Sequence, residues 1–166
     1  WAHVVPALLA KGMTTNGALA VLVWVGPTQV ASRFLFRVLG GNLTPRQVGY
    51  IVFAGQAAAF VILAQGESEA VLVLFAMLFG AVSGLAAIVR GNLVPAWFGR
   101  ANIGRIGGSM SSFALYARAA APLSAAALLA WPMSYDILML ALGGISFVAL
   151  MTYALARRPD FSRRSP

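Results

Sequence analysis

The residues best suited to chemistry in this chain are arginines placed within or between apolar segments. Arg90 and Arg118 lie inside two long apolar stretches, and Arg100 and Arg105 lie in the short connection between them. An arginine at the centre of a membrane helix costs about 2.5–3.5 kcal/mol on insertion scales, so it generally faces a cavity or a partner. These arginines are therefore candidates for binding an anionic solute or for marking one side of a membrane.

Arg118 is the most deeply placed of these arginines. It follows Arg105 by 13 residues and precedes Trp131 by 13, which is about 20 Å of helix on either side and places it at the midplane of a membrane span. Small residues share its helical face: Gly104, Gly107, Ser111, Ala114, Pro122 and Ala125. We predict that Arg118 and Ser111 contact a substrate. The alternative is an interhelical bond from Arg118 to a backbone carbonyl or to Gln29.

A second polar face runs along the apolar segment 17–40. Gln29 and Arg33 lie on it, and we predict that they contribute to the substrate site from a facing helix. Arg33 and Arg37 are near one end of the segment, where a long basic side chain reaches the membrane surface. That role is favoured for Arg37, and both roles stay open for Arg33.

Arg90 lies within about two turns of the end of its apolar segment. At that depth, reaching the surface or bonding to the loop is more common for arginine than contact with a ligand. We therefore assign Arg90, together with Arg100 and Arg105, to gating or to the cytoplasmic loop.

Groups that perform acid–base, nucleophilic or metal chemistry are scarce. The four acids lie outside or at the ends of the apolar segments: Glu67, Glu69, Asp136 and Asp160. His3 is the single histidine, cysteine is absent, and no base neighbours the serines at 109, 111 and 112. We expect no enzyme activity, no catalytic residue, no metal site and no cofactor.

The composition indicates an all-α integral membrane protein. Hydrophobic residues make up 60% of the 166 residues and charged residues 10%, with a mean hydropathy of +0.83. A soluble domain has about a quarter of its residues charged, so this chain could not cover a surface facing water. The net charge of +8 is explained by orientation in a membrane, and we expect no nucleic-acid partner.

The hydropathy pattern predicts five complete membrane-spanning helices, over residues 17–40, 46–65, 70–95, 103–130 and 135–156. Residues 1–10 are shorter than the roughly 20 residues of a span, and we expect them to be the end of a truncated helix. Residues 157–166 are expected to be a cytoplasmic tail. Pro27 should kink the first span, and Thr44 should cap the second, with Pro45 at its first position. Spans 46–65 and 135–156 carry no charge in their interiors and are expected to face lipid.

These spans separate the connections by charge. The arginine-bearing connections, 37–46 and 100–105, and the tail 157–166 fall on one side. Lys11, the acidic loop 66–69 and the turn 131–134 fall on the other. By the positive-inside rule, we predict a multi-pass protein of the plasma membrane with its C-terminus in the cytoplasm.

The chain resembles the C-terminal half of a major facilitator superfamily transporter. The resemblance rests on four stretches: His3-Val-Val-Pro with Gly12, Gly26-Pro-Thr-Gln-Val-Ala-Ser-Arg33, Arg90-Gly-Asn-Leu-Val-Pro-Ala-Trp-Phe-Gly-Arg100, and Arg118 with Pro122. It implies that residues 1–10 end the seventh helix and that the complete spans are helices eight to twelve of a twelve-helix fold. In that family the eighth, tenth and eleventh helices line the cavity, and an N-terminal half, missing here, supplies the rest.

The function expected from these observations is secondary active transport of a small solute by alternating access. A buried cation without a buried acid favours an organic anion as the substrate. Because the chain begins at Trp1 and not at Met, we expect it to be a piece of a longer protein. The alternative is a small structural or assembly protein without transport activity of its own. The lipid bilayer is the expected partner in both cases.

Overall fold

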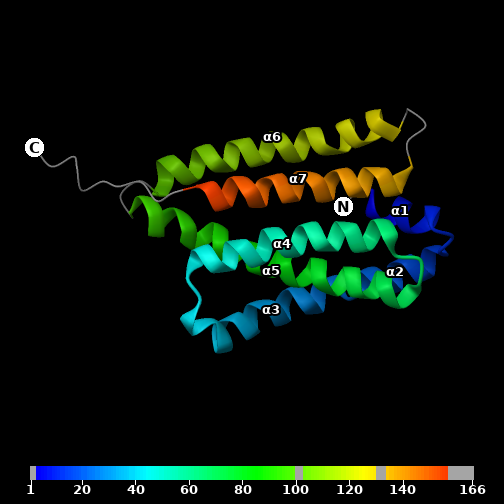
Figure 1. Ribbon diagram of the computed structural model, residues 1–166, viewed down its shortest axis with the longest axis horizontal. Helices are drawn as coiled ribbons and strands as arrows, with labels where there is room; N and C mark the ends of the chain where they lie inside the picture. The colour runs from blue at the N-terminus through cyan, green and yellow to red at the C-terminus, as the bar shows by residue number, and fades with distance from the viewer. Residues whose placement is uncertain (1–2, 100–102, 130–133, 157–166) are drawn as a thin grey trace, which may run out of the picture.

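The computed structural model of the protein describes residues 3–99, 103–129 and 134–156. This part of the chain is helical and contains no strand (Figure 1). Its α-helices are α1 (Val4–Ala10), α2 (Thr15–Val23), α3 (Val25–Leu39), α4 (Pro45–Gln65), α5 (Glu69–Phe98), α6 (Ile103–Leu129) and α7 (Tyr135–Leu155). A short 3-10 helix, Gly40–Asn42, follows α3.

Hydroxyl side chains fix where four of the helices begin. Thr14, Thr44, Ser68 and Ser134 accept hydrogen bonds from backbone N–H groups in the first turns of α2, α4, α5 and α7. These bonds satisfy N–H groups that have no partner within the helix. The predicted cap at Thr44 is confirmed, and Gln47 completes a capping box with it. α5 ends at Gly99, whose φ of 74° is a conformation that favours glycine.

The first predicted span is interrupted, but three residues before the proline that was expected to kink it. α2 ends at Val23 and α3 begins at Val25, so the break falls at Trp24. Pro27 causes this displacement, because it offers no N–H to the carbonyl of Val23 and its ring crowds that residue. Beside the break, the Thr28 hydroxyl donates to the Trp24 carbonyl at 2.7 Å.

The helices pack side by side, with α4 between α7 and α5, and α3 on the far side of α5 (Figure 1). α6 runs beside α7 and makes few contacts with the other described helices. The expectation that 46–65 and 135–156 face lipid is limited to the outer face of each helix. Their inner faces are buried, because α4 and α7 pack closely on one another.

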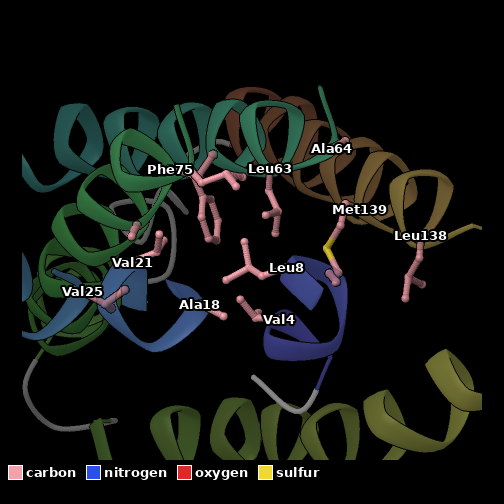
Figure 2. Packing of buried hydrophobic residues seen from close by; sticks show 14 residues of the cluster. Val4, Leu8, Ala18, Val21, Val25, Leu63, Ala64, Phe75, Leu138 and Met139 are labelled. Atoms are coloured by element: carbon pink, nitrogen blue, oxygen red, sulfur yellow. The ribbon is translucent and has the colours of Figure 1, made fainter. Parts of the chain in front are cut away.

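The main hydrophobic core lies where α1 and α2 meet α4, α5 and α7 (Figure 2). Leu8, Leu63 and Phe75 are almost completely buried at its centre. In Figure 2, Leu8 of α1 lies between Phe75 and Val4. A smaller cluster of Val48, Val52 and Val89 joins α4 to the second half of α5.

The contact between α3 and α5 depends on two glycines four residues apart, Gly80 and Gly84. A Cβ at Gly80 would lie 2.5 Å from the Val25 carbonyl oxygen, and one at Gly84 would meet the Gln29 carbonyl and the Ser32 hydroxyl. The two backbones therefore approach more closely than any larger residue would allow. Two glycines with the same spacing in α6 behave differently, because a Cβ at Gly104 or Gly108 meets nothing among the described residues.

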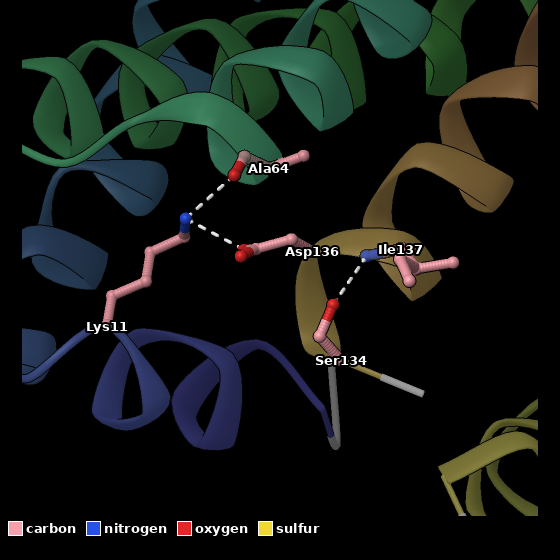
Figure 3. Close-up of polar contacts among 5 residues, drawn as sticks. All are labelled: Lys11, Ala64, Ser134, Asp136 and Ile137. Atoms are coloured by element: carbon pink, nitrogen blue, oxygen red, sulfur yellow. Dashed lines mark hydrogen bonds and ion pairs between the residues drawn. The ribbon is translucent and has the colours of Figure 1, made fainter. Parts of the chain in front are cut away.

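Polar contacts tie the two ends of the bundle. At one end, the Lys11 ammonium donates to the Ala64 carbonyl at 2.8 Å and pairs with the Asp136 carboxylate at 2.8 Å (Figure 3). At the other end, the Arg46 guanidinium donates to the carbonyl groups of Ala154 and Ala156 at 3.1 and 3.3 Å. The Lys11 connection, the end of α4 and the start of α7 therefore share one end, as the charge pattern predicted.

Four segments are long and apolar enough to cross a membrane: Thr15–Leu39, Pro45–Gln65, Glu69–Phe98 and Tyr135–Leu155. The fifth predicted span is present as the helix α6, but α6 is not among them. Its arginines, serines and Pro122 make it less apolar than the others. The protein is thus an all-helical chain with four candidate membrane spans. The predicted tail 157–166 and most of the turn 131–134 lie outside the described residues.

Candidate functional site

The site is a cleft of about 690 Å³ between the second half of α5 and the first half of α6. Arg90, Ser111 and Arg118 line it together. Its volume falls within the range of small-molecule sites, about 300–1,000 Å³. Three residues predicted separately from the sequence therefore meet in one cavity.

α6 presents its predicted small-residue face to this cleft. Gly104, Gly107, Ser111 and Ala114 line it along with Arg118, as the helical spacing predicted. Phe113 and Tyr116, on the opposite face of α6, do not line the cleft and are 77% and 74% exposed. The small side chains leave the space that the cavity occupies.

The α5 wall includes residues that the sequence analysis did not select. Gly91, Val94 and Pro95 follow Arg90 and line the same cavity. Their spacing of three and four residues is that of one helical face. This spacing would have identified them if the face had been extended beyond Arg90 toward the end of the helix.

The polar residues of the cleft lie at two levels. Counted at about 1.5 Å per residue from the turn that joins α5 to α6, Arg90 and Ser111 are both about 12 Å along their helices, and Arg118 is about 22 Å along α6. Counted from the other ends of the helices, the two arginines differ by about 15 Å. The backbone positions of Arg90 and Arg118 are thus offset by about 10–15 Å along the axes of α5 and α6.

The charge in the cleft is uncompensated. No carboxylate lines it, and neither Arg90 nor Arg118 makes a hydrogen bond or ion pair to any residue within 3–99, 103–129 and 134–156. Both arginines are exposed in the described chain, and like charges that share one cavity repel each other. Guanidinium groups pair with carboxylates through two parallel hydrogen bonds, so an organic anion would remove this repulsion.

Gln29 and Arg33 do not line this cleft. Both are on α3, which packs on α5. The Arg33 Nε donates to the backbone carbonyl of Gly84 at 3.4 Å. The backbone carbonyl of Gln29 accepts from the Ser32 hydroxyl at 3.0 Å. In this arrangement, the two predicted residues serve the contact between α3 and α5.

The two loop arginines stand apart from the cavity as well. Arg105 is exposed in the first turn of α6 and is not a lining residue. Arg100 lies outside the described residues. Within the described part of the chain, no group of three or more acidic, histidine or cysteine side chains could hold a metal ion.

No protein-family model, curated protein or solved structure matches this chain. The resemblance to the major facilitator superfamily therefore stays a prediction.

Proposed function

We propose that the chain is a helical half of a secondary transporter that moves a small organic anion across the plasma membrane by alternating access. The observation that carries this proposal is the cleft, where Arg90, Ser111 and Arg118 meet and no carboxylate of the described residues joins them. Both arginines are exposed in the described chain. A mobile anionic ligand is the simplest partner for such cations, because an unpaired charge within a membrane is costly.

The proposal includes orientation and partners. The connections carrying Arg46 and Arg105 belong to the cytoplasmic side, together with the C-terminus, and Lys11 belongs to the opposite side. The cleft is open along α6, which makes few contacts with the other described helices. A second helical half of the transporter would close it, in the manner of the major facilitator superfamily that the sequence resembles.

The test is uptake of organic anions by proteoliposomes that contain the full-length protein and the variants Arg118→Ala and Arg118→Lys. Arg118→Ala should abolish uptake or weaken the affinity for the anion strongly, while Arg118→Lys should retain part of it because the charge remains. Arg37→Ala is the matched control, since Arg37 is exposed at the end of α3 and outside the cleft.

Unchanged affinity in both Arg118 variants would remove this residue from the site. Absence of anion uptake by well-folded wild-type protein would contradict the transport proposal. The structural or assembly role would then be the better assignment.

A further inference from the structure

We propose that the cleft is selective for dianions and that Arg90 holds the second anionic group of the substrate. This inference rests on the proposed function and names the class of its substrate: a linear dicarboxylate with one carboxylate at Arg118 and the other at Arg90. It gives Arg90 a role in binding, where the sequence favoured a role at the loop.

Geometry supports two-point binding. Arg90 and Arg118 line the same cavity from different helices. Their backbone positions are offset by about 10–15 Å along the axes of α5 and α6. The long side chains of arginine can shorten the distance between the two guanidinium groups. An extended molecule with a charge at each end spans such a distance, whereas a single carboxylate engages only one of the guanidinium groups.

The surroundings of Arg90 also support a ligand role. Ser111 faces it across the cleft at the same level and supplies a hydroxyl that can donate to a carboxylate. The described part of the chain offers Arg90 no carboxylate and no carbonyl as a hydrogen-bond partner. Arg46, by contrast, donates to the Ala154 and Ala156 carbonyls at the end of α7. An arginine that only tied helices together would be expected to show such contacts.

The cleft walls between the two charges are small or apolar. Ala114 and Leu115 of α6 line the cleft at the levels between the two arginines. These groups suit the methylene chain that joins the two carboxylates of a linear dicarboxylate. The arrangement is polar at its two ends and apolar between them.

The experiment measures the uptake affinity of succinate, glutarate and adipate, each paired with the monocarboxylate of the same chain length. Wild-type protein, Arg90→Gln, Arg90→Lys, Arg118→Gln and the control Arg37→Gln are compared in phosphatidylcholine vesicles. Arg90→Gln should weaken the affinity for at least one dicarboxylate about ten- to hundred-fold and leave that of its monocarboxylate partner unchanged. Arg90→Lys should restore part of the loss, and Arg118→Gln should weaken both classes.

Two results would overturn the inference while leaving the proposed function in place. One is an equal loss, or no loss, for both classes of acid in Arg90→Gln, when Arg118→Gln still abolishes uptake. The other is an Arg90 effect that appears only in vesicles containing phosphatidylglycerol, because it would show that Arg90 binds a lipid headgroup. Absence of uptake for every acid would defeat both proposals.

Discussion

Replacing Gly84 with alanine tests the packing of α3 on α5 by the addition of one methyl group. The new Cβ would meet the Gln29 carbonyl oxygen and the Ser32 hydroxyl, and it would lie 3.2 Å from the Gln29 carbonyl carbon. Two of these three atoms belong to the backbone, so the contact is relieved only if α3 moves away. Overpacking of this kind costs about 1–3 kcal/mol, and the displacement also lengthens the bond from Arg33 Nε to the Gly84 carbonyl.

Alanine also stabilises a helix by up to about 1 kcal/mol relative to glycine, and a control must remove this contribution. Gly144→Ala provides it, because Gly144 is exposed in α7 and its added Cβ meets nothing among the described residues. Gly84→Ala should therefore be about 1–3 kcal/mol less stable to unfolding than Gly144→Ala. The free energy of unfolding is measured by titration with sodium dodecyl sulfate in mixed micelles, followed by circular dichroism.

Equal stability of the two variants would refute the close approach of α3 and α5. So would a Gly84→Ala protein that is more stable than the wild type.

Four further variants test the contacts at the two ends of the bundle. Lys11→Met removes a charged donor from a carbonyl at the end of α4, and it should lower the free energy of unfolding by about 1–3 kcal/mol in the same titration; a loss no larger than that of Asp136→Asn would contradict this. Asp136→Asn should cost less than about 1 kcal/mol, because its side chain is 51% exposed and water screens the pair. Thr44→Ala should cost about 1 kcal/mol through the lost capping box with Gln47, and undiminished helix content and stability would argue against the cap. Tyr153→Phe should cost about 0.5–1.5 kcal/mol, since the hydroxyl donates to two carbonyls at the start of α4; wild-type stability would show that these bonds contribute nothing.

The sequence predicted the helices well where local chemistry decides them. Thr44 and Pro45 mark the start of α4, and α4 begins at Pro45. Pro27 correctly signals a break, but the break falls at Trp24, since a proline disturbs the turn before it. Periodicity could not show that α4 lies between α5 and α7, because an uncharged helix looks the same whether other helices or lipid cover it.

The sequence predicted one wall of the candidate site and not the pairing of its two walls. The face of Arg118 follows from helical spacing alone, and the lining of the cleft confirms most of it. The pairing of this face with Arg90, and not with Gln29 or Arg33, depends on which helices become neighbours. The choice of neighbouring helices is a long-range property. α5 and α6 line the cleft together, while the Arg33 side chain donates to the Gly84 carbonyl across the α3–α5 contact.

In the membrane orientation proposed above, the unequal lengths of the helices would place the two arginines in different media. α4 and α7 each have 21 residues, about 31 Å, which matches a hydrocarbon thickness of about 30 Å. α5 has 30 residues, about 45 Å, and it starts beside the end of α4, so its surplus of about 13 Å lies beyond Arg90.

In that orientation, with α6 crossing the membrane as proposed, Arg118 would lie about 17 Å from the Lys11 end, within a hydrocarbon layer of about 30 Å. Arg90 is about 32 Å along, where that layer ends. A bilayer thickened by a few ångströms would submerge Arg90 or increase the tilt of α5. The thickness of the surrounding membrane thus sets the hydration of one wall of the cleft and leaves the other unchanged.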